Sequence, residues 1–330
     1  MIRGMYAGIS GMKAQQNKLD VIGNNLANVS TTGFKGSRVV FKDMMYQNSS
    51  NAVGASNNLG GSNAKQVGLG ASVGSIDRVM GQGMMQPTGR PLDLAMDGEG
   101  FFMVAKGPVA HKDGDITIDQ DGKLDAGGRE IMYTRDGSLS LDSEGYLVTS
   151  SGERVLGYVM TDGMDEDGTI NYVDADDPDI EAADGLRTLR IPDKVKFPAG
   201  NNGGQDEYKK VISYSIGKDG VITGVVEGGQ MTVIGQLATA SFKNAEGLEA
   251  VGNNMYLNSA NSGTPLISTG LGDDEPIENG SIMQGMLEMS NVDIAEQFTD
   301  LIVTSRAFQA SSKIISASDE ILQEVVNLKR

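Results

Sequence analysis

The chain contains no cysteine and no tryptophan, and it has only one histidine in 330 residues. Without cysteine, neither a disulfide nor a thiolate metal site can form. A histidine-dependent catalytic triad would have to use His111, which lies in a polar stretch and is accompanied by no nucleophile motif. We therefore expect no enzyme activity, no catalytic residue and no cofactor.

Long apolar runs and a basic surface are also missing. No run of about 18 apolar residues is present, the length that a membrane-spanning helix needs. The start of the chain lacks the apolar core of a secretory signal, because Arg3, Lys13, Lys18 and Asp20 interrupt it. A formal net charge of -17 argues against nucleic acid and acidic lipid as partners. We expect no membrane insertion, and a protein that is either cytoplasmic or exported without a cleaved signal.

Both ends of the chain carry an apolar side chain every seven residues. A strict seven-residue repeat places a narrow apolar stripe on a helix, which is typical of a coiled-coil seam. We expect helices over about 2–27 and 291–326, with Ser290 or Asn291 as N-cap of the second and Asp293 in its first turn. The predicted seam positions are Met5, Met12, Leu19, Leu26, Ile294, Phe298, Leu301, Phe308, Ile315 and Leu322, and a second row follows Ala307, Ile314, Ile321 and Leu328.

The second terminal helix is weak by composition. Four serines, at 311, 312, 316 and 318, lower its intrinsic helix propensity. We therefore expect the ends to be loose in a single chain and to become ordered when many copies pack together.

The middle of the chain has a different pattern. From about Val73 the apolar period changes to two, and short runs are bounded by Asp-Gly, Glu-Gly or Ser-Gly pairs, as in antiparallel hairpins. We expect an α+β multidomain protein whose terminal helices pair as a coiled coil. The expected parts are the helices at 1–30 and 290–330, an extended arm at 31–72, an antiparallel β-rich middle domain at 73–160 and 209–289, and a small inserted outer β domain at 161–208.

Partial matches to binding motifs are better explained as turns and strands. Asp165, Asp167, Asn171 and Asp174 have the spacing of a calcium loop, but Gly163 stands at its first position and the last ligand is Asp instead of Glu. Hairpin turns explain this match and a second one that includes Asp119, Asp121 and Asp125. Residues 68–74 resemble a phosphate-binding loop, but no helix pattern follows them, and a glycine-rich strand explains the segment.

The 18 methionines are numerous for a chain of this length. Most serve as ordinary core residues under the simplest interpretation. A sharper hypothesis is that flexible thioethers let contacts between subunits slide. The residues concerned are Met44, Met45, Met80, Met84 and Met85.

Several segments resemble one family in the right order along the chain. Residues 24–35, Asn-Asn-Leu-Ala-Asn-Val-Ser-Thr-Thr-Gly-Phe-Lys, resemble the N-terminal signature of bacterial flagellar rod and hook proteins. Residues 91–102, 133–137, 246–254 and 290–330 are similar to the same family. Within it the hook protein is most similar, because the additional sequence at about 106–130 and 161–208 fits an inserted outer domain. The distal rod protein is the alternative.

The resemblance implies a structural subunit of a helical homopolymer. The terminal helices would surround a central channel, and a curved hollow tube of subunits would transmit torque from the motor rod to the filament. The implied partners are further copies of the chain, the rod, hook cap and hook-filament junction proteins, and the type III export apparatus, with an extracellular location. A secreted adhesin is an alternative of another class, but the chain shows neither a long stalk nor a repeat array.

Overall fold

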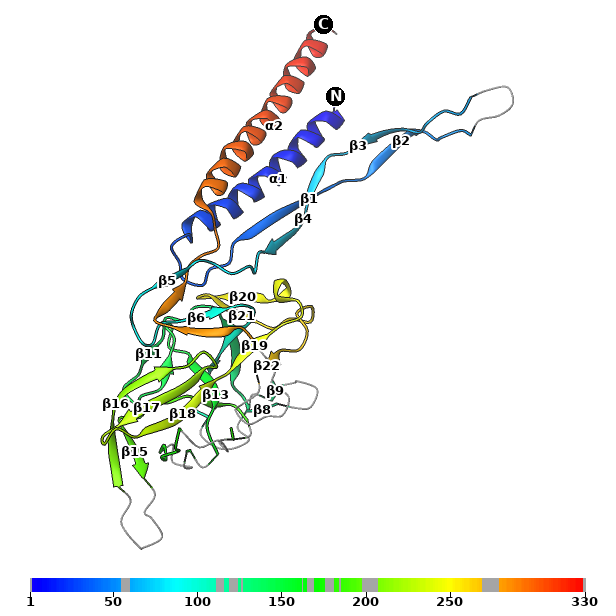
Figure 1. The fold of residues 1–330 in the computed structure, drawn as a ribbon. Coiled ribbons are helices and arrows are strands. Elements are labelled where there is room, and N and C mark those ends of the chain that lie inside the picture. Colours follow the sequence, from blue (N-terminus) through cyan, green and yellow to red (C-terminus); the bar gives the residue numbers. More distant parts are fainter. Residues whose placement is uncertain are drawn as a thin grey trace. The chain divides into compact units, whose positions relative to one another are not determined.

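The computed structural model divides the chain into two compact units (Figure 1). Unit 1 comprises Met1–Val29, Lys35–Val79 and Val292–Arg330, and unit 2 comprises Ser30–Phe34 and Met80–Asn291. The structure describes residues 2–54, 60–110, 116–118, 124–125, 127–161, 163–164, 169–175, 181–183, 185–197, 207–268 and 279–328.

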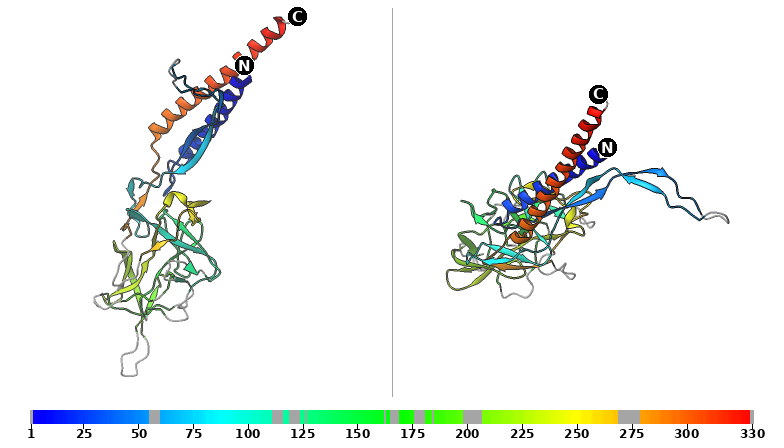
Figure 2. Two further views of the ribbon diagram at one scale, coloured as in Figure 1. Left: turned by 90° about the vertical axis from the view of Figure 1, so that its right-hand side faces the viewer. Right: turned by 90° about the horizontal axis from the view of Figure 1, so that it is seen from above.

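Two long helices form the ends of the chain in unit 1. Helix α1 spans Ile2–Ala27 and helix α2 spans Ile294–Leu328, and they lie side by side in both views of Figure 2. These bounds confirm the helices expected from the seven-residue repeats. The expected N-cap of α2 was wrong: the Asp293 carboxylate accepts hydrogen bonds from the backbone N–H groups of Ala295 (2.7 Å) and Glu296 (3.3 Å). Asp293 is thus the cap, since a carboxylate there satisfies free N–H groups of the first turn.

The arm of unit 1 is built from paired strands. Strand β1 (Ser37–Asp43) pairs antiparallel with β4 (Ala71–Arg78), and β2 (Tyr46–Ser50) pairs with β3 (Lys65–Gly68). Residues 68–74 therefore end one strand and begin the next, which confirms the strand interpretation of that glycine-rich segment. The arm approaches α1 closely at Gly70, where φ is +119° and a Cβ would overlap the Ser10 side chain.

Unit 2 is built mainly from antiparallel strands. Its main sheet has the order β15-β16-β17-β18-β13-β7-β10-β21-β20, and β6 pairs with β23 and β5 with β24 apart from it. The expected bounds of an outer domain at 161–208 stay a prediction, while the strands described there, β14 and β15, pair with β13 and β16 of the main sheet. The strands are β5 (Met85–Pro87), β6 (Leu94–Asp97), β7 (Phe101–Lys106), β8 (Thr117–Ile118), β9 (Leu124–Asp125), β10 (Glu130–Thr134), β11 (Ser140–Leu141), β12 (Leu147–Val148), β13 (Arg154–Tyr158), β14 (Arg187–Thr188), β15 (Lys194–Phe197), β16 (Glu207–Ile216), β17 (Val221–Val226), β18 (Met231–Leu237), β19 (Thr239–Ser241), β20 (Glu249–Gly252), β21 (Met255–Leu257), β22 (Leu266–Ile267), β23 (Ser281–Gln284) and β24 (Met286–Glu288), with a short 3-10 helix at Ala245–Gly247.

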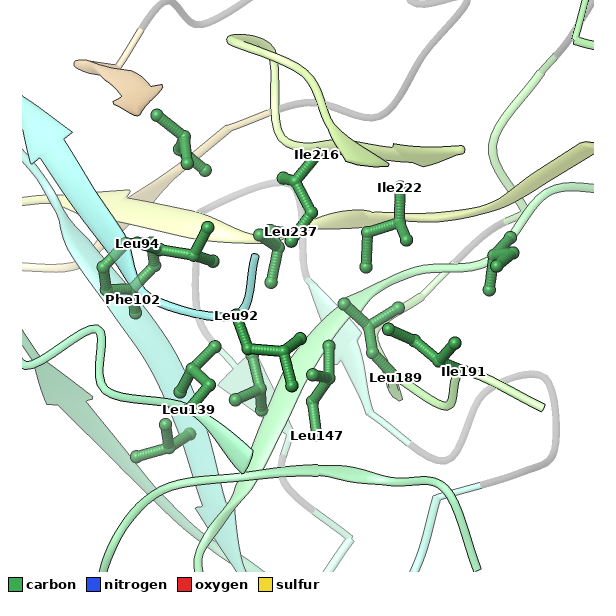
Figure 3. Close-up of a cluster of buried hydrophobic side chains, with 14 of the residues drawn as sticks. Leu92, Leu94, Phe102, Leu139, Leu147, Leu189, Ile191, Ile216, Ile222 and Leu237 are labelled. Atoms are coloured by element: carbon green, nitrogen blue, oxygen red, sulfur yellow. The ribbon is translucent and has the colours of Figure 1, made fainter. Parts of the chain in front are cut away.

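Strand β7 separates two hydrophobic cores in unit 2. Phe102 and Val104 belong to one core, and Phe101, Met103 and Ala105 belong to the other. This alternation follows from the period of two in a strand whose two faces are both covered. Figure 3 shows the first core, which includes Leu92, Leu94, Leu139, Leu147, Leu189, Ile191, Ile216, Ile222 and Leu237.

The second core is rich in aromatic rings. Phe101 meets Phe242 and Tyr256 edge to face, with centroid separations of 5.9 and 5.8 Å, and Tyr133 meets Phe242 in the same way at 4.8 Å. Such pairs add stability beyond the area they bury. In the part of the chain that the structure describes, no helix is long and apolar enough to cross a membrane.

Candidate functional site

The face of α2 that packs against α1 alternates apolar and polar positions. Its less exposed residues follow one another at spacings of four and three, as in a heptad seam. These residues include Gln297, Leu301, Thr304, Phe308, Ser311, Ile315, Ser318 and Leu322, and Asp300, Ser305 and Ala307 beside them are also half-buried. Four predicted seam positions thus form the apolar half of this face, and the other half is polar. A seam of this composition gains less from burial than an apolar one.

Helix α1 carries a matching stripe. Its less exposed residues include Met5, Gly8, Met12, Gln15, Leu19, Ile22 and Leu26, again three or four apart. The four predicted positions on this helix, at 5, 12, 19 and 26, lie on the stripe and are half-buried. Gly8 permits close contact with α2, because a Cβ there would come within 3.3 Å of Ile315 Cγ1.

A second apolar stripe on α2 stays largely exposed in the single chain, since Ala307 is half-buried and the other three residues of the predicted row are exposed. Ile314 is 51% exposed, Ile321 47% and Leu328 87%, although all three follow the same seven-residue rhythm. Ile294 and Phe298, which we assigned to the seam, are also about half exposed, at 48% and 49%. Contiguous exposed apolar side chains mark interaction surfaces in soluble proteins.

Polar contacts join the two helices near the C-terminal end of α1 and the N-terminal end of α2. The Asn25 side-chain amide donates to Ser37 O (2.8 Å) and Gln297 Oε1 (3.2 Å), and its oxygen accepts from Ser37 N (2.9 Å). Lys18 Nζ lies 2.9 Å from Asp300 Oδ2. Asn25 therefore joins α1, α2 and β1, a role that its sequence position as a helix-ending residue did not indicate.

The arm also exposes apolar side chains. Met45 is 79% exposed, and Val40, Phe41, Tyr46, Val67 and Ile76 are exposed as well. A two-stranded ribbon has little stability by itself in water, so this surface is suited to cover by other chain segments. Among the methionines singled out above, Met44, Met45 and Met84 are exposed, and their role in sliding contacts stays a hypothesis.

The candidate calcium residues are only partly described. Asp165 and Asp167 of the first candidate, and Asp119 and Asp121 of the second, lie outside the described residues. Asp174 forms an isolated bridge with Thr232, and the Asp125 carboxylate accepts a hydrogen bond from Gly127 N in a turn. Within the described ranges no group of three or more potential ligands could hold a metal ion.

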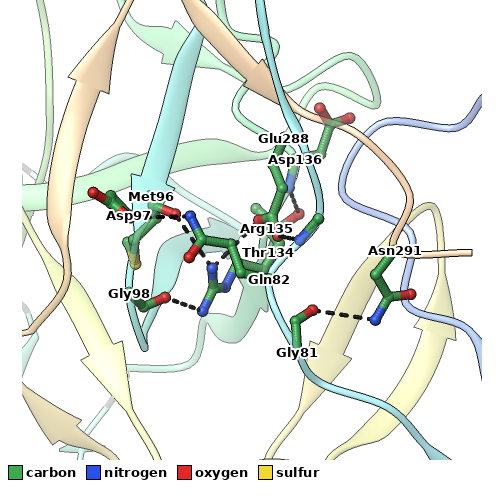
Figure 4. Close-up of polar contacts among 11 residues, drawn as sticks. Gly81, Gln82, Met96, Asp97, Gly98, Thr134, Arg135, Asp136, Glu288 and Asn291 are labelled. Atoms are coloured by element: carbon green, nitrogen blue, oxygen red, sulfur yellow. Dashed lines mark hydrogen bonds and ion pairs between the residues drawn. The ribbon is translucent and has the colours of Figure 1, made fainter.

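A buried polar network lies in unit 2 (Figure 4). Arg135 Nη1 is 3.3 Å from Glu288 Oε2, and the two side chains are 4% and 0% exposed. The other terminal nitrogen of Arg135 donates to Gly98 O (2.8 Å), and Glu288 Oε1 accepts from Gly83 N (2.7 Å). Sequence reasoning found Arg135 only within a family motif and missed Glu288. The signal for Glu288 was a single acid in an otherwise apolar stretch.

Asp136 continues this network. Its Oδ1 accepts hydrogen bonds from the Thr32 hydroxyl (2.9 Å) and from Ser138 N (3.1 Å), while Asn254 Nδ2 donates to Thr32 O (2.9 Å). Burial raises the pKa of the Asp136 carboxyl above its ordinary value, because desolvation outweighs these two hydrogen bonds, and the nearby Asp93 charge adds to the rise.

Paired terminal helices with an uncovered stripe, joined to a β-rich body, define a structural protein suited to self-association. Three family models match this chain. "Flagella basal body rod protein" matches residues 5–35, "Flagellar hook protein FlgE/F/G D1 domain" matches 124–224, and "Flagellar basal body rod FlgEFG protein C-terminal" matches 283–328.

Curated relatives agree with these models. The flagellar basal-body rod protein FlgG of Bacillus subtilis (strain 168) is 41% identical over 330 residues, which covers 100% of both chains. The flagellar hook protein FlgE of Borreliella burgdorferi is 28% identical over 468 residues, again covering 100% of both. A crystal structure of the Helicobacter pylori hook protein FlgE2 has a TM-score of 0.46 and 11% identity, and covers 62% of this chain and 100% of that chain. The chain belongs to the family of flagellar rod and hook proteins, whose members are structural proteins and not enzymes.

The polar half of the helix seam gives a first testable prediction. Thr304 is 1% exposed, and its hydroxyl has no hydrogen-bond partner among the residues that the structure describes. Thr304→Val keeps the shape and removes this hydroxyl, so the variant should be more stable by about 1 kcal/mol. Urea unfolding followed by circular dichroism at 222 nm measures the change. Thr299→Val is the matched control, because Thr299 is exposed on the same helix and its hydroxyl donates to Ala295 O. Equal or lower stability of Thr304→Val would contradict the prediction.

The raised pKa of Asp136 gives a second prediction. Because the pKa is higher in the folded chain than in the unfolded chain, the folded state binds more protons, and ionisation of Asp136 with rising pH lowers stability. Asp136→Asn keeps an oxygen for Thr32 and Ser138, so it should be more stable than the natural chain at pH 7. This advantage should shrink as the pH falls through the raised pKa towards the ordinary value of 3.8. Urea unfolding at several pH values tests it, with the exposed Asp125→Asn as control for charge loss, and a pH-independent difference would refute it.

Proposed function

We propose that this chain is a subunit of the distal flagellar rod, and that it polymerises through its terminal helices. The observation that carries the proposal of polymerisation is the second apolar stripe on α2. Ile314, Ile321 and Leu328 are exposed on a helix whose other stripe already packs on α1. Helices of neighbouring copies offer the same heptad spacing and can cover this stripe as in a helical bundle.

The distribution of charge supports contact between helices of different copies. Residues 1–30 carry a net charge of +2 and residues 291–330 carry -2, so the whole acidic excess lies in residues 31–290. Like charges repel when identical chains associate, and this repulsion is small where the net charge of the paired segments is near zero. The terminal helices are therefore the part of the chain on which close contact between copies is least opposed.

The choice of the rod over the hook rests on the relatives. The rod protein of Bacillus subtilis aligns over 330 residues and covers 100% of both chains. The hook proteins require alignments of 468 and 471 residues to cover both chains, at 28% identity. The additional sequence at about 106–130 and 161–208, on which we preferred the hook, is not tested by the relatives. The hook is our second candidate, because full-length hook proteins also align with the whole chain.

The proposed function implies the location and partners that the resemblance suggested. The subunit would leave the cell through the type III export apparatus and assemble outside the cytoplasm with further copies and with the neighbouring rod or hook components. An absence of cysteine suits export as an unfolded chain, because no disulfide can form along the route.

Electron microscopy of the purified polymer separates the two candidates. A distal rod subunit should form a straight, rigid shaft, whereas a hook subunit should form a bent tube with a hollow bore. The expected result is the straight shaft. Bent tubes would assign the chain to the hook and overturn the rod proposal.

Charge substitutions test the assembly surface. Ile321→Asp places a carboxylate on the exposed stripe and Leu322→Asp places one on the face towards α1, and burial of an unpaired charge is costly in either contact. Both variants should lose polymerisation, measured by sedimentation and negative-stain microscopy. Tyrosine near-ultraviolet circular dichroism should show a folded unit 2. Ser312→Asp, on the polar face of α2, is the matched control and should polymerise. Normal polymers from Ile321→Asp would rule out the exposed stripe as the assembly surface.

A further inference from the structure

The chain passes between its two units through three short segments of unit 2. Unit 2 contains Ser30–Phe34 and Met80–Asn291, so the chain enters or leaves it on either side of residues 30–34, before Met80 and after Asn291. Whatever force or motion unit 1 transmits to unit 2 along the chain therefore arrives at these segments.

The three segments are hydrogen-bonded to one another inside unit 2. Gly33 N donates to Glu288 O (2.8 Å), and Asn291 N donates to Phe34 O (3.4 Å). Asn291 Nδ2 donates to Gly81 O (3.1 Å), as Figure 4 shows, and Met289 N donates to Met84 O (2.9 Å). The three segments thus form one hydrogen-bonded cluster, although they are far apart in the sequence.

One glycine allows two of these segments to come this close, and a second allows residues 30–34 to approach the residues that follow strand β10. A Cβ at Gly83 would overlap the carbonyl oxygen of Met289. Gly33 has φ +66°, and a Cβ there would lie 2.7 Å from Asp136 N and 2.8 Å from the carbonyl carbon of Arg135. At both glycines one stretch of main chain therefore contacts another directly, and the Cβ of any other residue would prevent this contact.

The ion pair between Arg135 and Glu288 connects this hydrogen-bonded cluster to the main sheet of unit 2, which we call the β-body. Each oxygen of the Glu288 carboxylate has its own partner: Oε2 faces Arg135 and Oε1 accepts from Gly83 N. Arg135 follows strand β10 directly, donates to Gly98 O and lies 5.3 Å from the centre of the Phe101 ring. A buried ion pair of this kind holds its geometry best when additional hydrogen bonds satisfy its groups. Here Gly83 N and Gly98 O supply such bonds to Glu288 and Arg135, while Arg135 Nε has no hydrogen-bond partner among the described residues.

We propose that Arg135 and Glu288 are positioning residues that clamp all three connecting segments to the β-body. The clamp goes beyond polymerisation, because it acts within one chain and is the same for a rod or a hook subunit. Glu288 contributes twice, since its carboxylate holds residues 80–84 through Gly83 and its carbonyl oxygen holds residues 30–34 through Gly33. Breaking the pair should release the connecting segments before the body strands open.

The rival explanation is that the pair only stabilises the core of unit 2. Two variants separate the explanations. Glu288→Gln removes the negative charge and leaves Arg135 buried without a counter-ion. The double variant Arg135→Met with Glu288→Met replaces the pair by apolar side chains of similar volume, a change that often preserves stability, but it cannot accept the hydrogen bond of Gly83.

Hydrogen exchange of the full-length chain, read by mass spectrometry, measures each part separately. In the double variant, exchange in segments 30–34, 80–84 and 288–291 should accelerate about tenfold or more, because a hydrogen bond to a charged group is lost. Strands β7 and β13 should exchange as in the natural chain. Glu288→Gln should show at least the same acceleration in the segments.

Val155→Ala is the control, because Val155 is fully buried in β13 and lies outside the network. It should accelerate exchange in β7 and β13 at least as much as in the connecting segments. The proposal is overturned if the double variant leaves the three segments as protected as in the natural chain. It is equally overturned if the double variant accelerates body strands and segments alike, since the pair would then be an ordinary part of the core.

Discussion

One apolar stripe of α2 lies against α1 while a second stripe stays largely exposed, and the proposed assembly depends on this division. The inner face alternates large apolar residues such as Leu301 and Phe308 with polar ones such as Thr304 and Ser311. Polar residues reduce the gain from burial, so the pairing within one chain is weak for its length. Under the proposed function, neighbouring copies would cover the exposed stripe and add to the stability of the helix pair.

Unit 2, unlike the terminal helices, buries apolar side chains in cores of its own. Strand β7 is covered on both faces, and its residues Phe102 and Phe101 enter two separate cores. Close-packed interiors transmit strain and deform little. The same chain thus combines a self-sufficient body with ends whose apolar surface is left open. For a proposed rod or hook subunit, this combination fits a chain whose terminal helices become fully covered only in the polymer.

The sequence predicted the parts of the fold that depend on local pattern. The seven-residue repeats located both helices, because large apolar residues recur at one heptad position, but the polar partner position at Thr304 and Ser311 carried no hydrophobic signal. The alternation from Val73 indicated the strand that is β4, but its pairing with β1 was missed, because residues 31–72 were assigned to an extended arm. The Arg135–Glu288 pair was beyond reach for a different reason: its members are 153 residues apart, and only the folded chain brings them together.

Burying an ion pair costs desolvation free energy, and apolar residues of similar volume would stabilise the fold as well as the pair does. The advantage of the ion pair here is that its hydrogen bonds depend on direction. Apolar contacts tolerate sliding, whereas the two oxygens of Glu288 each require a particular donor, Arg135 on one side and Gly83 on the other. Because Gly33 and Gly83 also bring main chain against main chain, a shift of any one segment would break a hydrogen bond of the others. The buried Glu288 charge is therefore useful where the three connecting segments must keep their relative positions under mechanical force. In a core that only had to remain folded, the cost of burying this charge would bring no such benefit.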